Sequence, residues 1–145
     1  MIRITDALVA EHTVFCVVFE RIEEALPKMK TAAQIRIMAG LVERLLVHHG
    51  GAEQDLAYVT LDHMLKDKGE IDRLYTDHKE IDERLRLARK AKTATDARRL
   101  LKAAMAHSRA HFRYEEENIF PLIERTLQRE TLLRLGDAWQ KQRAA

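Results

Sequence analysis

The stretch EIDRLYTDHKEIDERLRLARKAK, residues 70–92, decides the fold class. Apolar side chains recur in it every three or four residues, which is the spacing of one face of an amphipathic helix. That face consists of Ile71, Leu74, Tyr75, His78, Ile81, Leu85 and Ala88. The stretch therefore predicts a long helix that turns one polar residue, His78, toward an apolar core.

Two other stretches end at proline and predict helices of similar length. We expect the first over about residues 5–26, because Pro27 stops it. Its inner stripe also includes one histidine: Leu8, His12, Phe15, Cys16, Phe19, Ile22 and Leu26. We expect another helix over about residues 96–120, which Pro121 ends or kinks, with candidate N-cap residues at 93–96.

The remaining long helix contains two adjacent glycines. It begins after Thr31, which forms a capping-box pair with Gln34, and we expect it to reach residue 65. Its apolar residues are Ile35, Met38, Leu41, Val42, Leu45, Leu46, Leu56, Val59, Leu61 and Leu65. Gly50 and Gly51 each cost roughly 1 kcal/mol inside a helix and could mark a break. We predict a continuous helix, since the pattern resumes without new capping residues, and expect the glycines to let a ligand or a backbone come close.

Four long helices joined by short turns, one of them at residues 66–69, predict an all-α antiparallel up-down four-helix bundle. A short fifth helix over about residues 128–142 is expected to pack on the outside of the bundle. Its apolar residues are Leu132, Leu133, Leu135 and Trp139. No internal repeat, low-complexity segment or long linker divides the chain, so residues 1–145 are interpreted as one domain.

Composition narrows the class of protein. Charged residues make up 33% and hydrophobic residues 46%, which is neither a disordered nor a membrane composition. The net charge is +2, and the basic stretch at residues 84–102 lacks aromatic residues, so we interpret it as a solvated surface and expect no nucleic-acid or membrane partner. Cys16 is the only cysteine and no signal pattern is present, which predicts a cytoplasmic protein. No feature indicates a protein partner or a homo-oligomer.

One histidine of each long helix lies 15 or 16 residues from a turn, and such residues share one level of an antiparallel bundle. These histidines are His12, His49, His78 and His111. Glu53 and Glu115 follow two of them by four residues, so each His/Glu pair shares a helix face. Imidazole and carboxylate ligands suit iron, manganese or zinc, and a buried carboxylate cluster without a cation is costly. The pattern predicts a metal centre.

Other polar residues near this level have alternative interpretations. His107, one turn before the level, is either an extra ligand or a residue that packs or hydrogen-bonds beside it. Cys16 is interpreted as a packed thiol, with a redox role as the alternative. Tyr75 and Tyr114 either pack in the core or hydrogen-bond near the site. The residues expected to face solvent are His48, His63, Glu116 and Glu117.

The order of these residues resembles the hemerythrin-like, or HHE cation-binding, family. The resemblance covers nearly the whole chain and rests on His12, His49-x-x-x-Glu53, Asp77-His78, His111-x-x-x-Glu115-Glu116 and Ile119-Phe120-Pro121. It implies two non-haem iron ions with an oxo or hydroxo bridge. By this resemblance, His12 and His49 ligate one iron, and His78 and His111 ligate the other. Glu53 and Glu115 bridge the two.

The chain departs from the invertebrate oxygen-carrying hemerythrins. Those proteins have a second histidine four residues upstream on the third helix, where this chain has Leu74, and their last bridging carboxylate is an Asp five residues after the histidine. The four-His, two-Glu pattern is more similar to the hemerythrin-like domains of bacterial iron–sulfur repair proteins and of a eukaryotic iron-sensing ubiquitin-ligase subunit. The missing nitrogen ligand is expected to leave each iron open or water-bound.

Two kinds of function follow from the resemblance, and the sequence leaves both open. The first is a di-iron module that binds or senses oxygen, nitric oxide or iron. The second is a di-iron oxidoreductase that acts on peroxide, oxygen or nitric oxide, or a protein that takes part in iron–sulfur centre repair. A bundle with no metal is the structural alternative. The expected partner in either metal-dependent function is a small diatomic ligand or peroxide.

Overall fold

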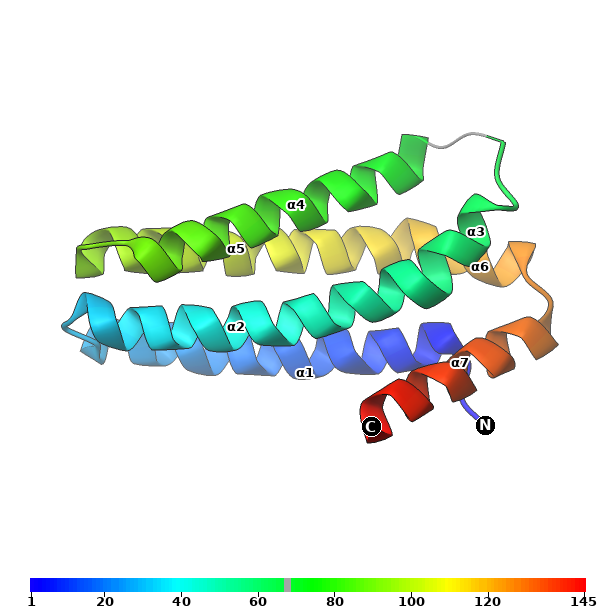
Figure 1. The fold of residues 1–145 in the computed structure, drawn as a ribbon, viewed down its shortest axis with the longest axis horizontal. Helices are drawn as coiled ribbons and strands as arrows, with labels where there is room; N and C mark the ends of the chain where they lie inside the picture. The colour runs from blue at the N-terminus through cyan, green and yellow to red at the C-terminus, as the bar shows by residue number, and fades with distance from the viewer. Residues whose placement is uncertain (67–68) are drawn as a thin grey trace.

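The computed structural model describes residues 1–66 and 69–145, and within these ranges the chain is all-α (Figure 1). Four long helices lie side by side with alternating chain direction: α1 (Ile4–Ala25), α2 (Ala32–Ala52), α4 (Gly69–Lys90) and α5 (Ala94–Tyr114). The predicted antiparallel bundle is confirmed. Of the turn predicted at residues 66–69, residues 67–68 lie outside the described residues.

Local sequence signals set the helix ends at the first and third turns. The short 3₁₀ helix η1 (Leu26–Lys28) contains Pro27 and follows α1 directly. The Thr31 hydroxyl accepts a hydrogen bond from Gln34 N, and the Gln34 side chain accepts one from Thr31 N, so the predicted capping box is present. The Thr93 hydroxyl accepts a hydrogen bond from Asp96 N and so caps α5, which starts that helix two residues before the predicted position.

Both helices that carry a glutamate of the predicted site widen into a π-helical turn at that glutamate. After α2 come η2 (Glu53–Tyr58) and α3 (Val59–Asp62); after α5 come η3 (Glu115–Ile119) and α6 (Phe120–Thr126). The chain therefore stays helical through the two glycines, as predicted. The prediction that the fourth helix ends at residue 120 is wrong, because Pro121 lies in the first turn of α6, where its missing N–H is tolerated.

The apolar core consists of two clusters with the predicted metal-binding level between them. The first cluster lies toward η1 and includes Phe19, Val42, Leu85 and Leu101. The second lies toward the opposite end and includes Leu8, Tyr58, Leu74 and Ile123. Cys16 is half-buried against the first cluster, which agrees with a packed thiol. The bundle is therefore apolar at both ends of its interior and polar in the middle.

Three residues predicted to face the core are exposed instead. Leu41, Val59 and Tyr75 are 46%, 44% and 38% exposed. For Val59 the cause is the π turn, which holds an extra residue and so rotates the helix that follows it. Ala57 and Tyr58 face the core in its place. Tyr75 and Leu41 lie at the edges of their stripes, and Tyr75 packs edge-on against the Tyr58 ring.

The last helix, α7 (Arg129–Ala144), packs against α1 on the outside of the bundle, as predicted (Figure 1). Gly136 makes this approach possible, because a Cβ atom built there would overlap the backbone carbonyl oxygen of Ile2. From that contact α7 runs back along the bundle, and its C-terminal end reaches the middle of the molecule.

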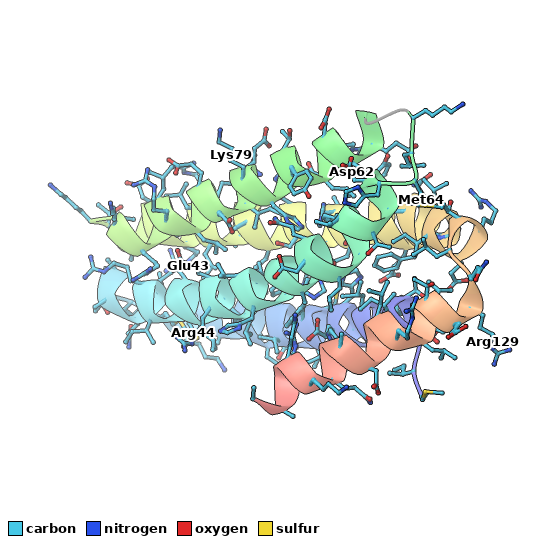
Figure 2. All side chains as sticks on the ribbon, turned by 45° about the vertical axis from the view of Figure 1, so that its right-hand side comes forward. Glu43, Arg44, Asp62, Met64, Lys79 and Arg129 are labelled. Atoms are coloured by element: carbon cyan, nitrogen blue, oxygen red, sulfur yellow. The ribbon has the colours of Figure 1, made fainter. Side chains whose placement is uncertain are left out.

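Charged side chains cover the outer faces of the helices (Figure 2). Within the basic stretch at residues 84–102, Arg86 pairs with Glu83 and Arg89 with Glu43. Among the described residues, no helix combines the length and the apolar character that crossing a membrane requires.

Candidate metal centre

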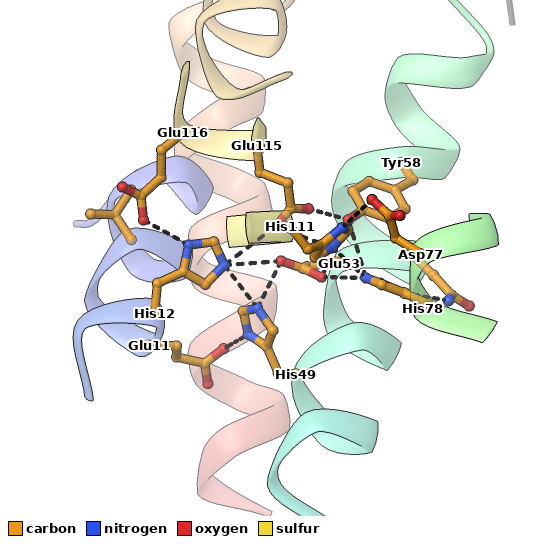
Figure 3. Close-up of polar contacts among 12 residues, drawn as sticks. Glu11, His12, His49, Glu53, Tyr58, Asp77, His78, His111, Glu115 and Glu116 are labelled. Carbon is orange, nitrogen blue, oxygen red and sulfur yellow. Dashed lines mark hydrogen bonds and ion pairs between the residues drawn. The ribbon is translucent and has the colours of Figure 1, made fainter. Parts of the chain in front are cut away.

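Side chains from the four long helices and their π turns meet in one buried layer halfway along the bundle (Figure 3). All six residues predicted to bind metal lie in it: His12, His49, Glu53, His78, His111 and Glu115. Five of them are at most 2% exposed, and the His78 side chain is 12% exposed. We call this set the His/Glu layer.

The layer forms two groups that share both glutamates. The first group is His12, His49, Glu53 and Glu115, and the second is Glu53, His78, His111 and Glu115. In each group, one nitrogen or oxygen atom from every residue lies within 4.8 Å of the others. Four converging nitrogen and oxygen donors are enough to hold one transition-metal ion.

The two oxygens of Glu53 face different histidine pairs. Oε1 lies 2.8 Å from His49 Nε2 and 3.4 Å from His12 Nε2. Oε2 lies 3.2 Å from His78 Nε2, which is itself 2.8 Å from His111 Nε2. A carboxylate placed in this way can bind one ion with each oxygen.

Glu115 carries a buried oxygen whose surroundings fit a cation. Its Oε2 lies 3.4 Å from His12 Nε2 and 3.5 Å from His111 Nε2, yet it has no hydrogen-bond partner among the described residues. An unsatisfied buried carboxylate oxygen costs free energy, more than a neutral group would. Because a cation between the two histidines would remove this cost, the residues present fit bound metal ions.

The first histidine pair has carboxylates on its outer nitrogens. His12 Nδ1 lies 2.8 Å from Glu116 Oε1, and His49 Nδ1 lies 2.6 Å from Glu11 Oε2. An Nδ1–H donated to a carboxylate leaves Nε2 free as the ligand atom and makes it more basic. Glu116 is exposed, as predicted, and its carboxylate also reaches His12 from the π turn η3.

The second histidine pair has one charged and one neutral outer partner. His111 Nδ1 lies 3.2 Å from Asp77 Oδ2, while His78 Nδ1 lies 3.0 Å from the Gln54 side-chain amide. His107 belongs to neither group and instead lies 3.1 Å from Asp77 Oδ1. This agrees with its interpretation as a residue that hydrogen-bonds beside the site.

Sequence reasoning missed one residue of the layer, Tyr58. Its buried hydroxyl donates to Glu115 Oε1 and lies 3.3 Å from Glu53 Oε2. Burial, and then the charges of the two glutamates, hold the pKa of Tyr58 well above its usual value, so the hydroxyl keeps its proton. The tyrosines considered instead lie away from the layer: Tyr75 is exposed, and Tyr114 packs under the Arg73 guanidinium.

Tyr58 follows Glu53 by five residues, a spacing that does not bring two side chains together on a regular α-helix. The π turn η2 spans both residues and brings the hydroxyl to the carboxylate. No residue type in the sequence marks this turn in advance. The residues expected to face solvent, His48, His63, Glu116 and Glu117, all do so.

Without metal, the layer attracts protons to the first histidine pair. Burial lowers the pKa of His12, but the nearby Glu115 and Glu53 carboxylates outweigh it and raise the pKa to about 10. Burial also lowers the pKa of His49, but the negative charge of Glu53 outweighs this effect and raises the pKa to about 9. Protons are therefore held more tightly at these two positions than on a free imidazole, and metal would compete with them there.

A cavity of about 250 Å³ reaches the layer between α2, α4 and α5. His78 and Gly51 are on its wall, and a Cβ built on Gly51 meets nothing within 4 Å. The neighbouring Gly50 leaves space for the His78 ring, which would lie 3.3 Å from its Cβ. The glycines were expected to let a ligand or a backbone come close; at Gly50 the group that comes close is instead the His78 side chain.

The first histidine pair is enclosed by aromatic rings. His12 stacks on Phe112 with 4.1 Å between ring centroids and lies 5.6 Å from Phe120. Phe15 packs edge-on against His49 at 5.0 Å. Of the four histidines in the layer, His49, His78 and His111 line the cavity and His12 does not.

Comparison with known families gives one match: the family described as Hemerythrin HHE cation binding domain matches residues 3–130. That range contains the whole His/Glu layer, and it ends near the start of α7. Comparison with curated proteins gives no match, and comparison with solved structures gives none.

Proposed function

This chain belongs to the hemerythrin HHE cation-binding domain family, and we propose that it holds two iron ions in the His/Glu layer and uses them to bind oxygen, nitric oxide or peroxide. The observation that carries the proposal is the placement of Glu53 and Glu115 in both donor groups, together with the unsatisfied Oε2 of Glu115. Two shared carboxylates support two adjacent ions rather than one.

The donor set limits the choice of metal. Each ion would have two imidazole nitrogens and oxygens from two carboxylates, a set that suits iron, manganese or zinc. Cys16 lies in the first core cluster, so no sulfur takes part. Iron is proposed from the family resemblance, and when bound it would supply redox chemistry and open coordination positions. The cytoplasmic location stays a prediction.

The surroundings support a ligand position at the ion of His78 and His111. An imidazole that donates to a carboxylate is a stronger ligand than one beside a neutral amide. His78 has the neutral partner, Gln54, and both histidines of this pair line the cavity, whereas only one of the other pair, His49, does. The ion it holds would therefore be the less electron-rich and the more accessible of the two.

An oxidoreductase acting on peroxide or oxygen is the second candidate, and Tyr58 favours it. Reduction of a bound ligand in a buried site requires a proton source nearby. The Tyr58 hydroxyl holds a proton 3.5 Å from His78 Nε2 and touches both shared glutamates. A role in iron–sulfur centre repair stays a prediction from the resemblance alone.

Metal analysis with optical spectroscopy tests the proposal. Protein reconstituted with ferrous ion without oxygen and then desalted should hold about two irons per chain. After oxidation it should absorb in the near ultraviolet, where zinc is silent. Iron should also raise the melting temperature, because it binds only the folded state. Less than one iron per chain, or tight zinc binding with no retained iron, would overturn the proposal.

A further inference from the structure

We infer that Arg143, on the C-terminal helix, is a positioning residue for the metal position of His12 and His49, and that it acts by holding the Glu11 carboxylate against His49. Arg143 lies beyond residue 130, where the family match ends, so this link is additional to the matched domain. The inference rests on the proposed metal function.

Three residues connect the last helix to the layer. Arg143 Nε lies 2.7 Å from Glu11 Oε1, and Arg143 Nη2 lies 3.1 Å from Glu11 Oε2. The same Glu11 Oε2 accepts the hydrogen bond from His49 Nδ1 at 2.6 Å (Figure 3). A guanidinium that meets both oxygens of a carboxylate fixes its orientation as well as its charge.

The Glu11 carboxylate is held more firmly than the other outer partners of the histidines. Its side chain is 16% exposed, against 40% for Glu116. Among the described residues, no guanidinium contacts Glu116, Asp77 or Gln54.

The rest of α7 is packed so that Arg143 reaches this point. Gly136 lies against the backbone of Ile2, and Leu132 is buried in the second core cluster. Trp139 packs on the same cluster, and the Arg143 guanidinium lies 5.5 Å from the centroid of its ring. Arg143 Nη2 also lies 3.4 Å from the carbonyl oxygen of His48, which ties the end of α7 to α2 beside the ligand His49.

Loss of Arg143 should therefore affect one ion and spare the other. Without the guanidinium, the Glu11 carboxylate can turn toward solvent, and His49 then loses the acceptor that orients its ring. Changing such outer partners typically costs about 10–100-fold in metal affinity. Asp77 and Gln54, the partners of His111 and His78, have no contact with Arg143, so their ion should keep its affinity.

Metal release from the full chain tests the inference. Arg143→Ala and the control Lys141→Ala are loaded with cobalt(II), and its transfer to a chromogenic chelator is followed. Lys141 is on the same helix but is 79% exposed and, among the described residues, pairs only with Asp137. We expect Arg143→Ala to release one of its two ions about tenfold faster and the second at the wild-type rate. Lys141→Ala should match wild type in both phases.

A measurement on the metal-free protein separates positioning from general destabilisation. In wild type, the His49 Nδ1 proton should give a downfield, slowly exchanging NMR signal, because Glu11 accepts it. Arg143→Ala should lose this signal while retaining wild-type helical circular dichroism, and Arg143→Lys should restore part of it. Glu11→Gln, which retains an acceptor oxygen without its charge, should release the same ion faster than wild type does.

Three outcomes would overturn the inference. They are wild-type release from Arg143→Ala, equal acceleration of both ions, and a His49 signal that survives the loss of Arg143. Each of these leaves the proposed function standing, provided wild type holds two ions. Wild-type protein that holds no metal overturns the proposed function, and the inference falls with it.

Discussion

The two histidine pairs of the layer share their ligand chemistry and differ in what surrounds them. His12 and His49 are enclosed by aromatic rings, and both turn their outer nitrogens to glutamates. His78 lies beside a cavity and turns its outer nitrogen to the neutral side chain of Gln54. Identical ligand residues can therefore serve a less accessible ion and a more accessible one, because the neighbouring residues decide how open each position is and which imidazole is the stronger donor.

The largest effect is expected when one of the two carboxylates that both histidine pairs share is removed. Glu115→Ala removes one donor from both groups, so the two cations would lie close together with one fewer anion between them. The iron content should then fall well below one ion per chain. His78→Ala removes one donor from one group, and water can replace it, so about one iron should remain. Metal analysis after desalting measures both.

Glu117→Ala is the control for this comparison, since Glu117 is exposed and contacts no ligand histidine. Glu116 is not a suitable control position, because its carboxylate forms a hydrogen bond with His12. Equal iron loss from His78→Ala and Glu115→Ala would leave the bridging role unsupported even if the site exists.

A smaller effect is expected when a larger side chain is placed in the cavity that reaches His78. A leucine at Gly51 would extend into the cavity that reaches His78, so azide binding to the oxidised protein should slow by about an order of magnitude. Iron content should stay at the wild-type value. Stopped-flow absorbance measures the rate. Gly40→Leu is the matched control, because Gly40 is also helical in α2 and has only ordinary contact with Arg89. An unchanged azide rate in Gly51→Leu would mean that the ligand enters elsewhere.

The smallest expected effect is the change with pH in the stability of the metal-free protein, which depends on His12 and His49. The pKa of His12 is about 10 and that of His49 about 9 in the metal-free fold, against about 6.5 in the unfolded chain. Their contribution to stability is therefore present in full below pH 6.5 and is lost as the pH rises through 9 to 10. Melting temperatures of metal-free protein should fall over that range.

Metal affinity should change in the opposite direction, because the ion displaces these protons and binds more tightly as the pH rises. Calorimetry in buffers of different ionisation enthalpy counts the protons released on binding. A metal-free protein that gains stability between pH 7 and 10, or binding that takes up protons, would contradict the assignment of charge to His12 and His49.

The helices and the level of the layer could be predicted because both depend on local signals. Thr31 caps α2 and Thr93 caps α5, and the ligand histidine follows its cap by 18 residues in each case. Because an α-helix rises by a fixed distance per residue, equal numbers of residues after the cap place the two histidines at equal heights in the bundle. His49 and His111 therefore had to share a level once their helices began where the caps indicated.

The rest of the site depends on features without a local signal. The π turns at Glu53 and Glu115 follow no residue pattern, and they account for the missed Tyr58, for the contact of Glu116 and for the misplaced Val59. Tertiary contacts were equally hidden. Arg143 and Glu11 are 132 residues apart, and neither stands in a recognisable motif.

The position of the layer between two apolar clusters has a consequence for how the bundle opens. Proteins undergo local unfolding in contiguous units, and an opening spreads until it meets a firmly held element. Ions in the His/Glu layer would cross-link all four long helices near the middle of the bundle. Fraying that begins at the η1 end would then stop at the layer, and fraying that begins near α3 and α6 would stop at its other side. The metal-bound bundle would behave as two short bundles that open independently about a rigid centre.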